Sequence, residues 1–425
     1  MSPIPVRRRP EARAEAIGRA QHPRLAPVMP DFTPPPAGLV PAPPLTRTLV
    51  LVMAASVGAT VANLYYNQPM LGAIGADLAA SPAAVGLIPT ATQLGFGLGL
   101  LLLVPLGDQM DRRRLILAQS AGLAVALVAA ALAPGAATLV FASVAVGLGS
   151  ALVHQIVPLA AEMAPPERRG ATVGTVMSGL LLGILLARVV SGAVAALAGW
   201  RAMFWLGAGL AVLIAALLAL TLPSRRAPPG SVPYGRLLLS LLTLVREEPA
   251  LRRAALTQAA LFGSFSAFWS ILALRLQTPP FAFGSFAAGL FGLVGAVGVL
   301  AAPLAGRTAD ARGPYVVIAL GTTASLAAWV FLGLVPGLAG LIVGVLVLDL
   351  GVQMTLIANQ AVIFALRPQS TGRVNTVFMV TMFLGGALGS LAASMSWARG
   401  GWALVATTGA LFAAVALLLG GRRRP

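Results

Sequence analysis

The sequence of 425 residues contains no cysteine and no lysine, and only 10% of its residues are charged. Without cysteine the chain can form no disulfide, no thiol nucleophile and no cysteine-ligated metal site. Soluble domains carry about 25% charged residues. A chain that is 58% hydrophobic, with a mean hydropathy of +0.89, is therefore not a soluble protein. These absences indicate a membrane protein.

The few charges are unevenly distributed, with 29 basic residues against 12 acidic ones and a net charge of +17. All basic residues are arginine, which we interpret as GC-rich bacterial codon usage. In a soluble protein this balance would suggest nucleic-acid binding. Here, however, the arginines fall in alternate connections between apolar segments, with the exception of Arg188, Arg201, Arg275 and Arg399. This is the positive-inside pattern, so we expect a lipid bilayer and not nucleic acid as the partner.

Apolar segments of spanning length, about 20 residues each, follow one another along the chain. We predict an all-α membrane protein with twelve transmembrane helices in two pseudo-symmetric six-helix halves. Both termini are expected on the cytoplasmic side of a bacterial inner membrane, because the arginine-rich connections lie on that side. The expected spans are 48–66, 84–106, 115–133, 138–161, 171–194, 201–221, 254–275, 286–306, 315–335, 338–364, 374–394 and 402–420.

The chain divides into four regions. Residues 1–46 are rich in proline and arginine and are expected to form a disordered cytoplasmic tail. The two halves are expected at 47–221 and 254–425. The linker 222–253 contains an apolar run, Leu237–Val245, that is too short to cross a bilayer. We therefore predict an amphipathic helix there, lying on the inner membrane surface.

Two stretches carry the same pattern, an apolar run that ends in an aspartate and arginines. Val104–Arg113 reads VPLGDQMDRR, and Gly306–Gly313 reads GRTADARG. Three pairs of residues are each 202 positions apart, namely Asp108 and Asp310, Trp200 and Trp402, and Gly170 and Gly372. Repeats at a fixed spacing within an apolar chain indicate two homologous membrane halves, which is the architecture of secondary transporters.

With these features the chain resembles the major facilitator superfamily, and within it the bacterial drug:proton and sugar efflux branch, over about residues 48–420. The loop signature of that family, Gly-x-Leu-Ala-Asp-Arg-x-Gly-Arg-Arg/Lys, is matched at Leu106, Asp108, Arg112 and Arg113, and in the second copy at Gly306, Ala309, Asp310 and Gly313. The resemblance implies transport by alternating access. The fifth span lacks the Gly-Pro pair of the family's antiporters, which weakens the case for antiport but not for transport.

The signature loops also suggest a physical role. Charge-assisted hydrogen bonds between helix ends would favour one orientation of the two halves. We expect such a cytoplasmic latch from Asp108, Arg112, Arg113 and Asp310. The alternative is that the arginines only determine topology.

Two charges fall inside apolar spans, Arg188 in the fifth and Asp349 in the tenth. An ionisable group at bilayer depth costs at least ~2.5–3.5 kcal/mol, so both are functional candidates. We predict a salt bridge between them, with Asp349 as the proton-coupling carboxylate; the alternative is a purely structural partner of Arg188. His154, in the fourth span, is a further coupling candidate, although a lone histidine is more often a packing residue.

The resemblance implies a substrate cavity lined by the first, fourth, seventh and tenth spans. The candidates for its wall, besides the charged residues, are Asn63, Gln155, Ser264, Phe265, Trp269 and Gln353. The aromatic pair Phe268 and Trp269 would suit a flat or cationic ligand. Small residues spaced by four in the fifth span, among them Gly179 and Gly183, are expected at the seam where the halves slide.

We expect no enzymatic activity, no cofactor and no metal, because the sequence has no Walker motif, no nucleophile–base pair and no metal-ligand cluster. The expected function is proton-coupled efflux of a small organic molecule, such as a drug-like compound or a sugar, by a monomer without an obligate protein partner. One alternative is a metabolite or sugar exporter of narrow specificity, or a uniporter. An alternative outside transport is a membrane sensor or scaffold on the same fold.

Overall fold

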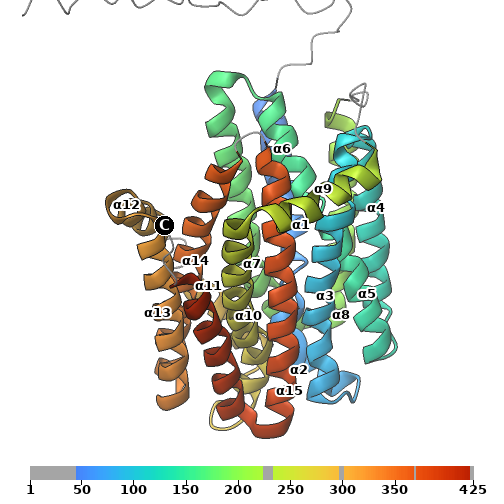
Figure 1. Cartoon of the computed structure of the whole chain (residues 1–425). Helices are drawn as coiled ribbons and strands as arrows, with labels where there is room; N and C mark the ends of the chain where they lie inside the picture. The colour runs from blue at the N-terminus through green and yellow to red at the C-terminus, as the bar shows by residue number, and fades with distance from the viewer. Residues whose placement is uncertain (1–44, 224–232, 296–300, 368–369, 422–425) are drawn as a thin grey trace, which may run out of the picture. The chain divides into compact units, whose positions relative to one another are not determined.

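The computed structural model describes residues 45–223, 233–295, 301–367 and 370–421, and all regular structure within these ranges is helical (Figure 1). The first half contains α1 (Arg47–Ala62), α2 (Asn67–Asp77), α3 (Pro82–Leu102), η1 (Pro105–Asp108), α4 (Arg112–Ala131), α5 (Ala136–Ser150), α6 (Val153–Met163), η2 (Pro166–Arg168), α7 (Arg169–Ala198) and α8 (Trp200–Thr221). The tail expected at 1–46 and the arginines at 422–424 lie almost wholly outside the described residues.

The linker helix and the second half follow. They contain α9 (Tyr234–Glu247), α10 (Pro249–Gln277), α11 (Ser285–Gly295), α12 (Ala301–Arg312), α13 (Pro314–Leu334), α14 (Leu338–Leu366) and α15 (Thr371–Gly420). Within the described residues, ten helical stretches are long and apolar enough to cross a membrane. One of them, α15, contains two spans, because its backbone leaves helical geometry at Gly400 and Gly401. The expected eighth span is represented by α11 and α12 on either side of 296–300. The all-α class and the twelve-span fold are thus confirmed.

The two halves make the same close helix–helix contact. A Cβ atom on Gly58, Gly179 or Gly183 would collide with backbone of the facing helix, so α1 and α7 touch through glycines. The equivalent contact between α10 and α15 uses Gly263, Gly385 and Gly389. Small residues allow such backbone approach within a membrane. The internal repeat is therefore visible in space, while the expectation that Gly179 and Gly183 form the seam between halves is wrong.

The first span is longer than predicted and is broken in the middle. It extends from Arg47 to Asp77, with an interruption at residues 63–66 between α1 and α2. There the backbone N–H groups of Asn63, Leu64 and Tyr65 donate to carbonyls three residues earlier. This tighter winding is typical of a local 3₁₀ turn. The polar run Asn63–Gln68, at the end of the expected span 48–66, therefore lies inside the observed span.

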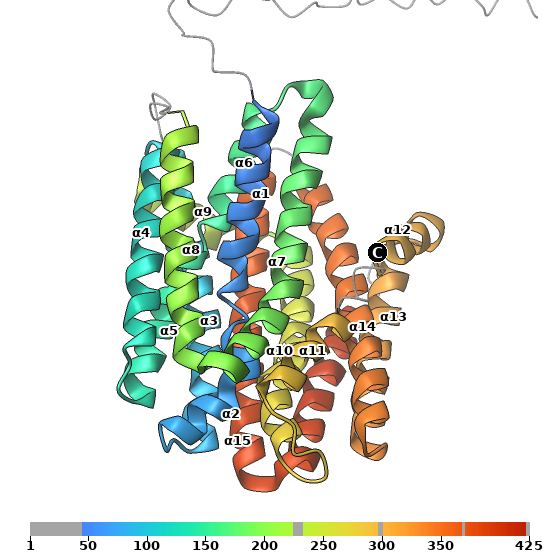
Figure 2. The same ribbon diagram turned by 180° about the vertical axis from the view of Figure 1, so that it is seen from behind.

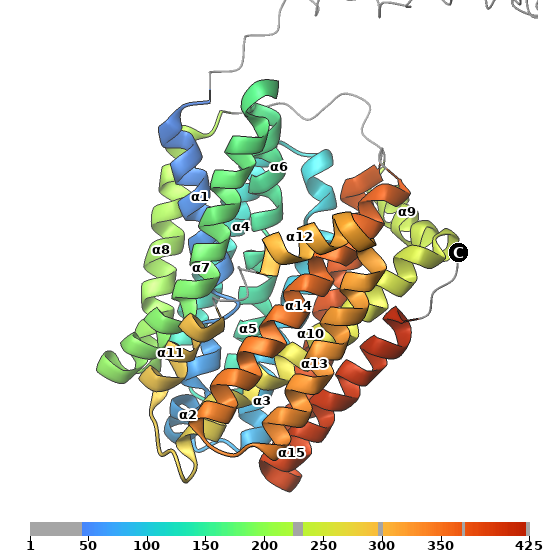
Figure 3. The same ribbon diagram turned by 90° about the vertical axis from the view of Figure 1, so that its left-hand side faces the viewer.

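The arginine-rich connections lie at one end of the bundle, called the basic end below (upper in Figures 1 and 2). At the opposite end the halves are in contact, because a Cβ on Gly192 of α7 would lie 2.6 Å from the carbonyl oxygen of Ser285 and 2.9 Å from Cα of Gly289. Toward the basic end, Gly174 of α7 and Gly306 of α12 have nothing within 4 Å of such an atom. Figure 3 shows α7 and α12 standing apart there. Within the described residues, α7 and α11 are therefore in contact at one end, while α7 and α12 are not in contact at these two glycines toward the basic end.

Helix α9 covers the segment where an amphipathic helix was expected. Its Leu241 and Leu244 are buried against the second half, while Leu239 and Leu242 are exposed. The Tyr234 hydroxyl donates to the carbonyl of Leu102 at the end of α3, 2.8 Å away. The helix therefore contacts both halves at the basic end.

A charged cluster connects α9 to the end of α14. Arg367 hydrogen-bonds to Glu248 at 2.7 Å and to Glu247 at 3.0 Å. These two bonds raise the pKa of Arg367 above its usual value, so this arginine stays charged and holds the linker to the second half.

Candidate functional site

Arg188 lies in α7 where this helix meets the second half, and it is only 4% exposed. Its Nε donates to Oε1 of Gln68 at 2.9 Å. The guanidinium carbon lies 3.8 Å from the ring centroid of Trp269 and 4.7 Å from that of Tyr65. Nη2 is buried and has no hydrogen-bond partner. The cation is thus stabilised by one hydrogen bond and two aromatic faces.

Asp349 in α14 is 5% exposed and also contacts Trp269. Its Oδ1 accepts from Nε1 of Trp269 at 3.4 Å, which is long for a hydrogen bond. Within the described residues, Arg188 and Asp349 form no ion pair at 4.0 Å or less. The predicted direct salt bridge is therefore wrong for this structure. Trp269 lies between the two charges instead, with its ring on the cation and its N–H on the carboxylate.

Two glycines of α11 leave room for this cluster. A Cβ on Gly292 would lie 2.9 Å from Cβ of Arg188, and one on Gly295 would lie 2.5 Å from Oδ2 of Asp349 and 2.9 Å from the Trp269 ring. A larger residue at either position would displace one of the charged side chains. The fold therefore brings α7, α10, α11 and α14 together at the two intramembrane charges.

Aromatic side chains connect this cluster to the basic end. Phe265 lies 6.1 Å from Trp269 between ring centroids, and it stacks on Phe262 at 5.4 Å. The row continues through Phe383 at 5.2 Å and Phe96 at 4.5 Å to His154 at 5.8 Å, each distance being measured between the centroids of successive rings.

His154 is half-buried. It lines a cavity of about 310 Å³ that lies between the halves at the basic end, with Gln155 and Arg112 on one side and Gly372, Arg373 and Thr376 on the other.

Several predicted wall residues lie elsewhere. The Ser264 hydroxyl donates to the carbonyl of Gly409 at 3.0 Å and accepts from Trp329 at 2.6 Å, inside the second half. Asn63 donates its amide to two carbonyls of its own helix. Phe268 is fully buried in the core of the second half.

The two glutamines of the predicted wall are nearer to the basic end. Gln155 donates to the carbonyls of Leu103 at 2.8 Å and Val104 at 3.2 Å, where α3 ends. Gln353 is half-buried, one helical turn from Asp349 toward the basic end. Gln155 therefore lies at the basic-end cavity, and Gln353 lies one helical turn from the charged cluster.

The hydrogen bonds shown for two residues of the expected latch, Arg112 and Arg113, are made within the first half. Arg112 donates to the carbonyl of Gly107 at 3.1 Å and to Glu162 at 2.6 Å. Arg113 donates to the carbonyl of Ala219 at 2.6 Å. Asp310 is exposed, and the side chain of Asp108 lies outside the part of the chain that the structure describes. The contacts shown for Arg112 and Arg113 therefore brace the first half internally.

Two residues of the cluster were missed from the sequence, Tyr65 and Gln68. Both belong to the polar run Asn63–Gln68, which lies at the end of the expected span 48–66. The signal was present, because glutamine and asparagine inside an apolar span are as costly as other buried polar groups. Extending the span to Asp77 would have placed this run at the depth of Arg188.

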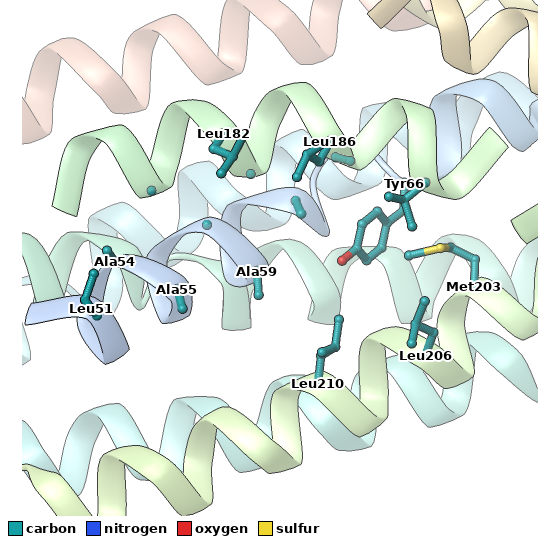
Figure 4. Close-up of a pocket in the computed structure, with 16 residues that line it drawn as sticks. Leu51, Ala54, Ala55, Ala59, Tyr66, Leu182, Leu186, Met203, Leu206 and Leu210 are labelled. Carbon is teal, nitrogen blue, oxygen red and sulfur yellow. The ribbon is translucent and has the colours of Figure 1, made fainter. Parts of the chain in front are cut away.

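A second cavity, of about 440 Å³, lies between α1, α7 and α8 (Figure 4). Its lining is apolar except for the hydroxyl of Tyr66, which points into it. It opens on the outer surface of the bundle, where Leu51 is 63% and Leu182 is 54% exposed. None of the predicted site residues line this cavity. It therefore lacks the charges that distinguish the cluster around Trp269.

A bundle of two repeated six-helix halves with opposite charges buried where they meet defines a multi-pass membrane transporter. The model of the Major Facilitator Superfamily matches residues 50–390, and the chain belongs to this family. It is 40% identical over 377 residues to the "Uncharacterized transporter YgaY" of Escherichia coli O157:H7, covering 88% of this chain and 95% of that protein. It is 34% identical over 370 residues to "Probable transporter SCO4007" of Streptomyces coelicolor, and the match covers 86% of this chain and 85% of that protein.

Among solved structures, the fold is similar to that of a bacterial homolog of the human lysosomal transporter Spinster in an inward-facing and occupied conformation. The TM-score is 0.73 with 16% sequence identity, covering 88% of this chain and 95% of the other. At this identity the similarity concerns the fold alone.

Proposed function

We propose that this protein is a secondary active transporter of the bacterial inner membrane that exports a small organic molecule in exchange for protons. The observation that carries the proposal is the contact of Trp269 with both Arg188 and Asp349. Arg188 belongs to the first half, whereas Trp269 and Asp349 belong to the second. A rocking movement of the halves therefore changes the surroundings of both charges at once.

The coupling follows from the electrostatics of a buried carboxylate. Such a group keeps its proton when no cation is near and loses it when a cation approaches. In this structure Trp269 separates Asp349 from Arg188. When the halves rock, the distance between the two groups changes, so Asp349 takes up a proton in one state and releases it in the other. A protein that alternates in this way can exchange protons for substrate.

The structure also supports a route for the substrate. The positive-inside rule assigns the basic end to the cytoplasm. The contact of α7 with α11 at the other end, and the open space at Gly174 and Gly306 among the described residues at this end, support an inward-open arrangement. Substrate would enter through the cavity beside His154 and move toward Trp269 along the row of aromatic rings.

A uniporter is the second candidate. It is favoured by the fifth span, which has no proline in α7 and therefore lacks the Gly-Pro pair of the family's antiporters. A uniporter needs no change in the protonation of Asp349. The two candidates therefore differ in whether a proton gradient drives accumulation.

The test is accumulation in inside-out vesicles energised by a proton gradient. Fluorescent cations, labelled sugars and aromatic carboxylates are supplied to wild-type protein, to Asp349→Asn and to the control Asp77→Asn, in which the exchanged carboxylate lies at the opposite end beside Arg201. We expect gradient-dependent accumulation of one class by wild type and by the control, and its loss in Asp349→Asn. Transport that the gradient does not drive would support the uniporter. If none of the supplied compounds is transported, with or without the gradient, both the proton-coupled exporter and the uniporter are contradicted.

A further inference from the structure

Arg188 has donors that the protein does not use. A guanidinium carries five N–H donors in a planar fork. Nε is bonded to Gln68, while Nη2 is buried without a partner. Within the described residues, no carboxylate lies within 4.0 Å of Arg188. An unpaired buried donor is unfavourable unless another molecule bonds to it. The geometry of the fork matches the two oxygens of a carboxylate.

The aromatic faces around the cluster are already occupied. The Trp269 ring lies against the guanidinium of Arg188 at 3.8 Å, and Tyr65 lies at 4.7 Å. These are the faces on which a cationic substrate would otherwise bind. A substrate cation at this position would also meet the positive charge of Arg188. The expectation of a cationic ligand on Trp269 is therefore replaced by that of an anion.

The neighbouring rings indicate what the rest of the molecule is like. Phe265 is half-buried and lies between Trp269 and Phe262. The row of rings that begins here continues to the cavity at the basic end, where His154 lies. Flat rings gain from offset-stacked and edge-to-face contacts with such a row. Phe262, Phe383 and Phe96 are buried in the core, so the half-buried Phe265 is the ring against which the aromatic body of a substrate would lie.

We propose that the Arg188 fork binds the carboxylate of an aromatic organic anion, with the aromatic body of this substrate lying along Phe265 toward the basic end. This inference rests on the proposed function, because it names the substrate class of the same transport site. It also explains how substrate and proton alternate. The substrate carboxylate occupies the position beside Arg188 that Asp349 would occupy when the halves rock, so the bound anion keeps Asp349 away from the cation.

The experiment uses purified full-length protein in lipid nanodiscs, without a proton gradient. Binding is measured by calorimetry for three matched pairs: benzoate and benzamide, 3-phenylpropionate and its amide, and 1-naphthoate and 1-naphthamide. The two members of a pair differ in charge and hardly in shape. We expect at least one carboxylate to bind about tenfold or more tightly than its amide, because charge-assisted bidentate bonds are the stronger ones.

The variants locate the preference. Arg188→Gln is expected to abolish the difference between carboxylate and amide. Arg188→Lys is expected to retain part of it, because the charge remains while the fork is lost. Arg275→Gln changes an arginine at the opposite end, beside Phe281, and is expected to bind like wild type. Thermal unfolding shows which variants are folded. If Arg188→Gln does not fold, the carboxylate preference of Arg188→Lys alone decides whether Arg188 binds the carboxylate.

The inference is overturned if no pair shows the preference, or if the preference survives in a folded Arg188 variant unchanged. Its failure can be told apart from failure of the proposed function. Gradient-driven export of a neutral or cationic molecule that requires Asp349 would overturn the anion site and leave proton-coupled export intact. A carboxylate preference that depends on Arg188, without gradient-driven transport, would do the reverse.

Discussion

The guanidinium carbon of Arg188 lies 3.8 Å from the ring centroid of Trp269, and the Nε1 of the same indole lies 3.4 Å from Oδ1 of Asp349. One side chain therefore contacts both intramembrane charges. Because Arg188 belongs to α7 and Trp269 to α10, the contact crosses between the two halves. The proposed coupling between a movement of the halves and the protonation of Asp349 rests on this contact.

The two contacts of Trp269 can be separated by substitution. Trp269→Phe removes the N–H donor to Asp349 but keeps an aromatic face on Arg188, whereas Trp269→Leu removes both. Desolvated cation–π contacts contribute up to about 2 kcal/mol. We expect Trp269→Leu to be less stable than Trp269→Phe by about 1–2 kcal/mol. Thermal unfolding in detergent measures this difference, and equal stability of the two variants would show that the contact with Arg188 contributes little.

Exchange of the two charges is expected not to restore function. In Arg188→Asp/Asp349→Arg the new arginine would lack Gln68 and Tyr65, which lie beside α7 and not beside α14. We expect transport by the double variant to stay as low as in either single variant. A direct salt bridge would instead permit the exchange. Recovery of a substantial part of wild-type transport would therefore contradict the arrangement described here.

The fold could be predicted from the sequence far more completely than the site. The spans follow from long apolar runs, and the repeat from pairs such as Trp200 and Trp402. Arg188 and Asp349 were recognisable because each is a lone charge in an apolar span. The position of Trp269 between them was not recognisable, because it depends on how α7, α10 and α14 are rotated and packed, which apolar composition does not specify.

Other misassignments have the same cause. Ser264 shares its helix with Trp269, but it lies on the face that packs inside the second half. Gln68 was missed because the first span was ended too early, before the interruption at 63–66. Apolar content locates a span, whereas the face that a residue presents depends on contacts between residues that are far apart in the sequence.

The separation of the halves at the basic end predicts which positions react with thiol reagents. The chain has no cysteine, so a single introduced cysteine gives no background. Thr376 lines the basic-end cavity, whereas Ala288 borders the same small enclosed space as Arg188 and Trp269 and is 3% exposed. We expect Thr376→Cys to react from the basic side with a membrane-impermeant maleimide and Ala288→Cys to stay unlabelled. Labelling of both at similar rates would contradict closure at the opposite end.

The glycine contact at the opposite end predicts a conformational bias. A side chain at Gly192 would meet Ser285 and Gly289, whereas one at Gly174 has nothing within 4 Å. Gly192→Leu is therefore expected to disfavour this arrangement and to slow labelling of Thr376→Cys. Gly174→Leu serves as the matched control on the same helix and should leave that labelling unchanged. The rate of maleimide incorporation checks both.

His154 is expected to act through packing. Its ring lies 5.8 Å from that of Phe96 at a tilt of 59°. Phenylalanine would keep this ring contact and remove the titratable group. We expect His154→Phe to retain at least about half of the wild-type transport rate, because aromatic contacts of this kind depend on shape and area. A complete loss of proton-driven transport in a folded His154→Phe protein would move the coupling group to His154.

The coupling role of Asp349 is tested most directly by comparing two modes of transport in the same vesicles. One is accumulation driven by a proton gradient, and the other is exchange of labelled for unlabelled substrate at equilibrium, which needs no net proton movement. For Asp349→Asn, we expect loss of gradient-driven accumulation with equilibrium exchange retained. Accumulation at the wild-type level in Asp349→Asn would contradict it.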